Sequence, residues 1–249
     1  DKRIPVAAGL AGGSSDAAAT IDSALEAWGA ALDPDTRSRV ALGLGSDVPF
    51  FFAGGPALVE GRGERVTPLA GVGGSPGVLL VTPAVALPTG AVFEAFTMLR
   101  VANGGRGDGS ARLSSEHLAS ELRSGLSVAD LVARAGVLAA ANDLLPAAAA
   151  LVPTLIPFRR ALFRLLGRPV GLSGSGPTLW TLYPSEAEAA EAAEAVGVAV
   201  REGRLAGPGG RPPFVAATTI LGSDAPAPRA SSDPAPMITI EPLTRRSAP

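Results

Sequence analysis

The sequence predicts an α+β protein built from two domains. Apolar runs typical of strands alternate with helical segments, and in the second half the helices are expected on one face of a sheet, as in a ferredoxin-like domain. Near the start, a glycine-rich loop at residues 5–15 runs directly into a helical pattern. The glycine-rich stretch 71–77 predicts a flexible junction, which places the domains at residues 1–70 and 76–222.

The first domain is expected to hold a long helix, a short helix at 36–42 and a strand pair across 57–66. The long helix follows from apolar residues at helical spacing, which are Ala18, Ile21, Leu25 and Trp28. The two tryptophans, Trp28 and Trp180, are interpreted as core residues.

The second domain is expected to alternate strands and helices. Strands are predicted at 77–82, 170–173, 178–183 and 214–221, and helices from Thr89 through Phe96 and at 115–123, 128–135, 154–166 and 186–196. Thr89 is expected to cap its helix, and residues 103–109 are expected to form a mobile loop. Six prolines within residues 223–249 predict a disordered tail.

The loop at 5–15 has the features of an anion-binding site. Glycines allow positive φ and a close approach of the backbone to phosphate oxygens. The first turn of the following helix offers unpaired N–H groups and the positive end of the helix dipole, and serine hydroxyls there can cap the helix, contact phosphate or approach a metal. The candidate residues are Pro5, Val6, Ala7, Ala8, Gly9, Leu10, Ala11, Gly12, Gly13, Ser14 and Ser15. A plain glycine turn before a capped helix is the alternative.

The type of loop can be narrowed by its spacing. It lacks the Gly-Lys-Ser/Thr ending of a P-loop, and its glycines do not follow the GxGxxG pattern of a dinucleotide fold. It resembles the second motif of the GHMP kinases, the small-molecule kinases that include galactokinase, homoserine kinase, mevalonate kinase and phosphomevalonate kinase. In that family the motif wraps the phosphates of ATP.

Two further segments carry the same resemblance, in the same order along the chain. Residues 44–64, with a Gly-Ser-Asp-Val-Pro turn, resemble the region of the family's catalytic aspartate, and residues 171–178 resemble its third motif. The resemblance assigns phosphate contacts in the third motif to Ser173, Gly174, Ser175 and Gly176. Together the three motifs relate most of residues 1–222 to the family.

Asp47 suits the role of the carboxylate that accepts the proton of an alcohol during phosphoryl transfer. Pro49 is expected to keep Val48 extended, and residues 50–52, all phenylalanine, are expected to give the turn an apolar backing. The alternative is that Asp47 only forms an Asx-turn or caps a helix.

The resemblance implies a GHMP kinase fold, with a ribosomal-protein-S5-like N-terminal domain and a ferredoxin-like C-terminal domain. It implies that ATP and Mg²⁺ are used to phosphorylate the 2-hydroxyl of 4-diphosphocytidyl-2-C-methyl-D-erythritol, in non-mevalonate isoprenoid biosynthesis. A homoserine- or mevalonate-type kinase and a non-catalytic nucleotide-binding remnant remain alternatives. The family's lysine and acceptor-clamping residues precede the loop, and with Asp1 four residues before Pro5 we expect this chain to lack them.

Composition excludes several other classes. The chain has no cysteine, so it holds no disulfide or thiolate metal site, and a net charge of −2 provides no general attraction for nucleic acid. With no run of eighteen apolar residues, the sequence indicates a cytoplasmic enzyme without a membrane partner. His117 is expected to be solvated, and Asn142 to form a turn before a helix.

Overall fold

The computed structural model describes residues 4–102, 104 and 109–221. The predicted tail at 223–249 lies outside the described residues, as does most of the loop predicted at 103–109. The chain divides into two compact units. The smaller unit contains Gly13–Gly54 and Val59–Thr67, and the larger contains residues 4–12, Gly55–Leu58 and the rest of the described chain.

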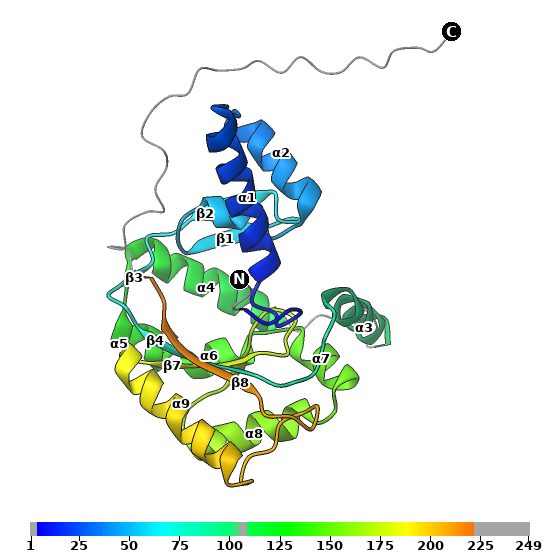
Figure 1. Ribbon diagram of the computed structural model, residues 1–249, viewed down its shortest axis with the longest axis vertical. Helices are drawn as coiled ribbons and strands as arrows, with labels where there is room; N and C mark the ends of the chain where they lie inside the picture. Colours follow the sequence, from blue (N-terminus) through cyan, green and yellow to red (C-terminus); the bar gives the residue numbers. More distant parts are fainter. Residues whose placement is uncertain (1–3, 103, 105–108, 222–249) are drawn as a thin grey trace. The chain divides into compact units, whose positions relative to one another are not determined.

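Helices and strands alternate along the chain (Figure 1). The α-helices are α1 (Gly12–Trp28), α2 (Pro34–Leu44), α3 (Thr89–Ala102), α4 (Gly109–Ser124), α5 (Val128–Ala133), α6 (Ala135–Ala140), α7 (Leu145–Leu151), α8 (Leu155–Leu166) and α9 (Glu186–Arg201), and η1 (Pro49–Phe52) is a 3₁₀ helix. The strands are β1 (Ala57–Glu60), β2 (Arg65–Pro68), β3 (Val72–Gly73), β4 (Gly77–Thr82), β5 (Leu126–Ser127), β6 (Gly171–Leu172), β7 (Leu179–Tyr183) and β8 (Phe214–Thr219).

The larger unit is organised around a four-stranded antiparallel sheet in the order β6-β7-β4-β8. In its centre Leu79 lies opposite Thr181 on β7 and Ala217 on β8. This sheet confirms the strands expected at 77–82, 178–183 and 214–221. The α+β class is therefore confirmed.

Helices pack on both faces of this sheet, which corrects the expectation that helices cover one face. Leu79 and Val81 of β4 pack into one apolar cluster with residues of α3, α7, α8 and α9. Val78, on the opposite face of β4, packs into a second cluster with residues of β3, β5, α4, α5 and α6. Figure 1 shows α8 and α9 on one side of the strands and α4 on the other. The near-continuous apolar run of β4 fits a strand that is buried on both sides.

Several short elements depart from the sequence-based expectation. The stretch expected as a flexible junction contains β3, in which Val72 is buried and pairs in parallel with Leu126 of β5. The single helix expected at 128–135 is α5 followed by α6, and α7 was not predicted. A two-residue strand carries no local periodicity, so its pairing depends on contacts distant in sequence. The domain limits themselves remain predictions.

The smaller unit has its own apolar cluster, formed by Ala18, Ala41 and Val48 and supported by neighbouring side chains such as Phe52. Arg37 of α2 reinforces it, because its guanidinium pairs with Asp22 of α1 and stacks on the Phe52 ring at 3.8 Å. Helices α1 and α2 and η1 are thereby held together.

Trp28 corrects the expectation of a core residue, because it is 73% exposed. It is the last residue of α1, and it does not belong to the apolar cluster of this unit. Trp180 is half-buried against the second cluster of the larger unit.

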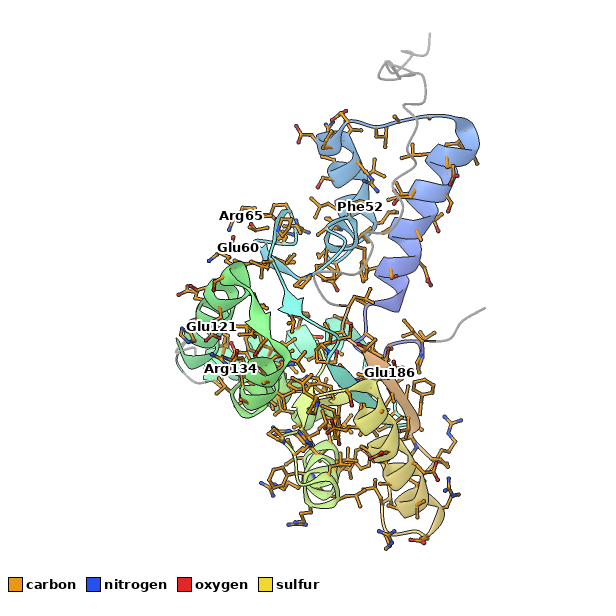
Figure 2. All side chains as sticks on the ribbon, turned by 90° about the vertical axis from the view of Figure 1, so that its left-hand side faces the viewer. Phe52, Glu60, Arg65, Glu121, Arg134 and Glu186 are labelled. Atoms are coloured by element: carbon orange, nitrogen blue, oxygen red, sulfur yellow. The ribbon has the colours of Figure 1, made fainter. Side chains whose placement is uncertain are left out.

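Strands β1 and β2 form a two-stranded sheet, as the strand pair predicted for 57–66 requires. Glu60 and Arg65 form an ion pair across it at 3.7 Å, and both are labelled in Figure 2. Such an exposed pair stabilises the hairpin only weakly.

Among the helices within residues 4–102, 104 and 109–221, none has the length and apolar character needed to cross a bilayer.

Candidate functional site

The glycine-rich loop adopts the backbone conformation that its sequence predicts. Ala7, Gly9 and Ala11 have φ values of 55°, 72° and 50°, so positive φ recurs at every second residue. Backbone of this alternating kind turns successive N–H groups toward one side and forms concavities that bind anions. Two alanines in the left-handed region cost about 1–2 kcal/mol each. Such strain is found at ligand-binding loops that the surrounding structure holds in place.

The structure brings this loop against the second predicted loop, residues 173–176. The Ser173 hydroxyl donates to the Gly9 carbonyl oxygen at 2.8 Å, and the Thr178 backbone N–H donates to the Ala8 carbonyl oxygen at 3.2 Å. A Cβ on Gly9 would lie 2.5 Å from the Ser173 carbonyl oxygen and 2.7 Å from that of Gly176. Only glycine fits this contact, which explains why the loop needs glycine at this position.

The second loop is anchored to the sheet and to α3 through hydroxyl groups. Ser175 is 5% exposed, and its hydroxyl lies 3.1 Å from that of Thr89. Thr82 and Thr178 form a buried hydroxyl pair at 2.7 Å. Thr89 is the first residue of α3, so it does not occupy the N-cap position and the capping role expected for it is wrong. Its hydroxyl instead connects the helix to the loop, a role that sequence reasoning missed. The hydroxyls of Ser173 and Ser175 therefore shape the loop. The backbone N–H groups of Ser173 and Gly176 also donate to backbone carbonyl oxygens, those of Thr178 and Ser173, so the part of the loop suited to phosphate is the backbone of Gly174 and Ser175.

Asn142 holds the second loop from a different direction. Its side-chain N–H groups donate to the carbonyl oxygens of Leu172 and Gly174, both at 2.9 Å. Its side-chain oxygen accepts a hydrogen bond from the backbone N–H of Leu144, also at 2.9 Å. The turn predicted at Asn142 is therefore confirmed, and the same side chain also fixes a loop thirty residues away, which the sequence did not indicate.

Helix α1 begins at Gly12, directly after the loop. Ser14 and Ser15 consequently lie within its first turn, so neither occupies the N-cap position, and the capping role considered for them is wrong. The first turn contains no acidic residue that would oppose an anion. The dipole and the N–H groups of this turn favour negative charge.

In the smaller unit, Asp47 lies exposed on a tight turn between α2 and η1. The turn is closed by a hydrogen bond from the Val48 N–H to the Gly45 carbonyl oxygen at 3.1 Å, and the Val48 side chain is buried. Val48 has φ −64° and ψ −43°, so the prediction that Pro49 keeps it extended is wrong. The hydrogen bonding of the turn outweighs the steric preference of the residue before proline.

The Asp47 carboxylate makes no hydrogen bond or ion pair within the part of the chain that the structure describes. The alternative roles in an Asx-turn or a helix cap therefore have no contact to support them. The apolar backing expected from residues 50–52 is present, because Phe51 and Phe52 pack against the cluster that includes Val48. Asp47 is thus an accessible carboxylate on an anchored turn.

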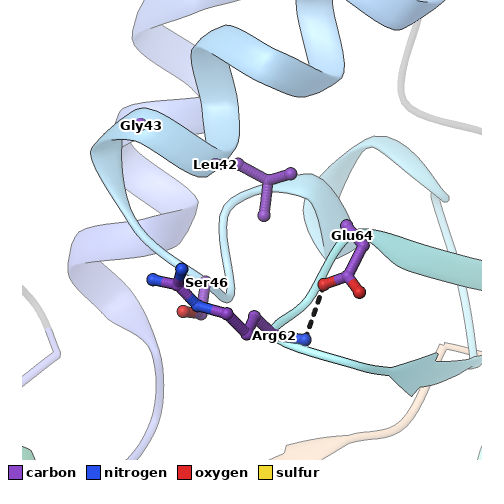
Figure 3. Close-up of a pocket in the computed structure, with 5 residues that line it drawn as sticks. All are labelled: Leu42, Gly43, Ser46, Arg62 and Glu64. Atoms are coloured by element: carbon purple, nitrogen blue, oxygen red, sulfur yellow. Dashed lines mark hydrogen bonds between the residues drawn. The ribbon is translucent and has the colours of Figure 1, made fainter.

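A pocket of about 390 Å³ lies beside this turn (Figure 3). It is lined by Leu42, Gly43, Ser46, Arg62 and Glu64. Arg62 and Glu64 come from the connection between β1 and β2, and Ser46 precedes Asp47 in the chain. Hydrogen bonds from backbone N–H groups lower the pKa of the Glu64 carboxyl, so this pocket contains one carboxylate and one guanidinium.

The other candidates contribute no metal centre. His117 is confirmed as solvent-exposed and lies 3.4 Å from Glu121. Within residues 4–102, 104 and 109–221, no group of three histidine or acidic side chains is arranged to hold a metal ion. The polar groups that the two glycine-rich segments offer are backbone N–H groups and the hydroxyls of Ser14 and Ser15. This donor set suits phosphate oxygens.

Two segments of the sequence match a described family. Residues 1–55 match the description "GHMP kinases N terminal domain", and residues 120–200 match "GHMP kinases C terminal". The two matches lie in the expected order and together cover more than half of the sequence. The chain belongs to the GHMP kinase family.

Within this family, the chain is similar to kinases of one particular name. The chain is 36% identical over 215 residues to a 4-diphosphocytidyl-2-C-methyl-D-erythritol kinase of Sinorhizobium medicae, covering 84% of this chain and 65% of that protein. It is 37% identical over 202 residues to a kinase of the same name from Paramagnetospirillum magneticum, covering 80% and 64%. The chain therefore spans slightly less than two thirds of the length of these relatives.

Solved structures agree on the fold. A crystal structure of 4-(cytidine 5'-diphospho)-2C-methyl-D-erythritol kinase has a TM-score of 0.57 and 28% identity, with 89% of this chain and 70% of that chain covered. A homoserine kinase from Cytophaga hutchinsonii has a TM-score of 0.61 with 16% identity, covering 89% and 68%. The second likeness concerns the fold alone.

Proposed function

We propose that this chain carries the ATP-binding loops and the catalytic carboxylate of a kinase that phosphorylates the 2-hydroxyl of 4-diphosphocytidyl-2-C-methyl-D-erythritol. The observation that carries the proposal is the docking of residues 5–12 on residues 173–176, through Gly9 and Ser173. The names of the relatives support the acceptor, because two of them at 36% and 37% identity are kinases for that cytidyl compound. The reaction belongs to isoprenoid precursor synthesis in the cytoplasm.

The loop at residues 5–15 is proposed to hold the triphosphate. Its alternating positive φ values present backbone N–H groups to the phosphate oxygens, and α1 adds the positive end of its dipole. The backbone of residues 173–176 is proposed to close over the same phosphates. The hydroxyl of Ser14 or Ser15 would hold a Mg²⁺ ion bound with ATP, and that ion would supply positive charge to the phosphates.

Asp47 is proposed to orient the acceptor hydroxyl and to accept its proton. The hydroxyl oxygen forms a bond to the γ-phosphorus while the bond from that phosphorus to the bridging oxygen breaks, and ADP leaves. The exposed carboxylate on an anchored turn suits this role, since it is accessible to substrate and fixed at its base by the buried Val48.

The test follows phosphate transfer in the gene product that contains this sequence. Purified protein receives ATP and Mg²⁺ with the cytidyl acceptor, homoserine or mevalonate, and ³¹P NMR identifies the phosphorylated product. We expect a new phosphate monoester with the cytidyl acceptor alone. Phosphorylation of homoserine or mevalonate would show that this compound, and not the cytidyl compound, is the acceptor. ATP binding without any phosphorylated product would show that the chain is a non-catalytic nucleotide-binding protein.

An Asp47→Asn variant tests the catalytic carboxylate. It keeps the size of the side chain and loses the proton acceptor, so we expect kcat to fall by about 10²- to 10⁴-fold. The KM for ATP should change little, because the proposed nucleotide contacts lie in the two loops. Normal turnover in this variant would remove Asp47 from the mechanism.

A further inference from the structure

The connection between β1 and β2, residues 61–64, packs against the turn that carries Asp47. A Cβ on Gly63 would lie 1.9 Å from the Ser46 carbonyl oxygen and 2.8 Å from the Ser46 carbonyl carbon. Gly63 also has a φ of +108°, a conformation that other residues rarely adopt. The two backbone segments therefore touch at a point that only glycine permits. We call residues 61–64 the hairpin tip.

This contact acts on the peptide bond of the proposed catalytic residue. The Ser46 carbonyl belongs to the peptide group that links Ser46 to Asp47. On the other side of Asp47, Val48 is buried and its N–H donates to Gly45. The backbone of Asp47 is thus fixed on one side by the apolar core and on the other side by Gly63.

The hairpin tip is held rigid by its own hydrogen bonds. The Gly63 N–H donates to the Glu60 carbonyl oxygen at 3.2 Å, and the Arg62 backbone N–H donates to the Glu64 carboxylate at 2.6 Å (Figure 3). Backbone hydrogen bonds, including that from Arg62, lower the pKa of the Glu64 carboxyl, so it remains ionised near neutral pH. A charged acceptor strengthens these hydrogen bonds.

We propose that the hairpin tip is a positioning element for Asp47. Gly63 sets the orientation of the peptide group between Ser46 and Asp47, and the Glu64 carboxylate keeps the tip in the conformation that makes this contact. Both segments also line the same pocket, through Ser46 on the turn and through Arg62 and Glu64 on the tip. This inference rests on the proposed function of Asp47, and it adds positioning residues that touch neither substrate nor nucleotide.

Gly63→Ala is the test. The added methyl must displace the Ser46 carbonyl, and a shift of about 1 Å at a catalytic group lowers the rate by about 100-fold. We expect kcat to fall by about 10- to 100-fold with the KM for ATP unchanged, a split that general destabilisation would not produce. Gly29→Ala is the matched control, because Gly29 also has positive φ, at 60°, and nothing lies within 4 Å of its Cβ position. Equal losses in the two variants would overturn the proposal.

A second measurement does not depend on catalysis. Amide hydrogen exchange of residues 45–48, followed by mass spectrometry, should become at least tenfold faster in Gly63→Ala and remain unchanged in Gly29→Ala. If the wild-type protein shows no turnover, the proposed function fails, and the exchange measurement still decides whether the tip fixes the turn. Unchanged exchange in Gly63→Ala would refute the positioning role.

Glu64→Gln tests how much the hydrogen bond to the Glu64 carboxylate contributes, because it leaves the contact between Gly63 and Ser46 in place. The amide oxygen still accepts the hydrogen bond from Arg62, and the charge that strengthens it is removed. We therefore expect a kcat reduction of less than about 10-fold, smaller than that of Gly63→Ala. A loss from Glu64→Gln that exceeds the loss from Gly63→Ala would show that the carboxylate acts by another route.

Discussion

Replacing Asn142 tests whether the second loop depends on this one side chain. Its two side-chain N–H contacts go to the carbonyl oxygens of Leu172 and Gly174, and its oxygen receives the Leu144 N–H. A neutral hydrogen bond contributes a net 0.5–1.5 kcal/mol, roughly. Asn142→Ala removes three such bonds, so we expect the free energy of unfolding of the larger unit to fall by about 3 kcal/mol.

Asn142→Asp sharpens the same test. The variant keeps the size of the side chain and an oxygen that accepts from Leu144, but it places carboxylate oxygens where two N–H groups faced carbonyls. The loss of two bonds costs about 2 kcal/mol, and repulsion between oxygens adds to it. We therefore expect Asn142→Asp to be at least as destabilising as Asn142→Ala, although it is the smaller change in shape.

Trp180 provides the assay, because its ring N–H donates to the Leu172 carbonyl oxygen at 3.2 Å and so reports on the end of the same loop. The other tryptophan, Trp28, is exposed in the smaller unit and is replaced by phenylalanine in all variants. Urea unfolding is followed by Trp180 fluorescence. The control is Ser124→Ala, whose exposed hydroxyl bonds only within its own helix and should change stability by less than about 0.5 kcal/mol. Equal unfolding midpoints for Asn142→Ala and Ser124→Ala would refute the reasoning.

The remaining predictions concern the first loop and an ion pair. Gly9→Ala should weaken ATP binding, measured by calorimetry, by at least about 10-fold, since the methyl meets three backbone atoms of the second loop; Gly210→Ala, with φ +65° and open space, should leave it unchanged. Hydrogen bonds from Arg134 lower the pKa of the Glu121 carboxyl below its ordinary value, and both residues are labelled in Figure 2. This stabilisation is therefore present above the ordinary pKa of a glutamate and is lost as pH falls through the lowered pKa. Thermal midpoints of wild type and Glu121→Gln should converge as the solution is acidified, and a constant difference would exclude the ion pair.

Elements with strong local patterns could be predicted from the sequence, because their stability is encoded where they occur. Strand β4 is an uninterrupted apolar run, and α8 begins and ends within one residue of the predicted 154–166. Helix α9 begins at Glu186 as predicted, after Ser185 caps it, but continues five residues beyond the predicted end. Its last turn includes Ala199 and Val200, which pack in the same apolar cluster as Leu79 and Val81 of β4, so this turn depends on contacts with the sheet as well as on local spacing.

The parts that could not be predicted depend on contacts between distant segments. Nothing near Val72 indicates that it pairs with Leu126, and the exposure of Trp28 follows from the small size of the cluster beneath α1. Val48 followed the hydrogen bonding of its turn instead of the preference imposed by Pro49. In each case a tertiary contact decides between conformations that the local sequence permits.

The same distinction applies to the candidate site. The glycine pattern of residues 9–13 indicated a phosphate loop, and the Ser-Gly-Ser-Gly run indicated a second one, but neither pattern shows that Ser173 donates to Gly9. Asn142 was visible as a turn residue through its own neighbourhood, whereas its two bonds to the second loop have no local signal. Sequence motifs thus select the segments of a site, and the hydrogen bonds between segments determine their geometry.

Gly9 and Gly63 suggest one physical rule for both parts of the proposed site. Each has positive φ, and at each a Cβ would strike a backbone carbonyl oxygen of another segment, Ser173 or Ser46. A substitution there therefore has a conformational cost, from φ, and a contact cost, from the collision. Alanine at Gly210 or Gly29 carries the first cost without the second, because nothing lies near those Cβ positions. For Gly9 and Gly210, whose φ values of 72° and 65° are close, the difference between the two alanine variants isolates the close backbone contact. Gly63, at φ +108°, carries a larger conformational cost than Gly29 at 60°, so for this pair the hydrogen exchange of residues 45–48 identifies the contact.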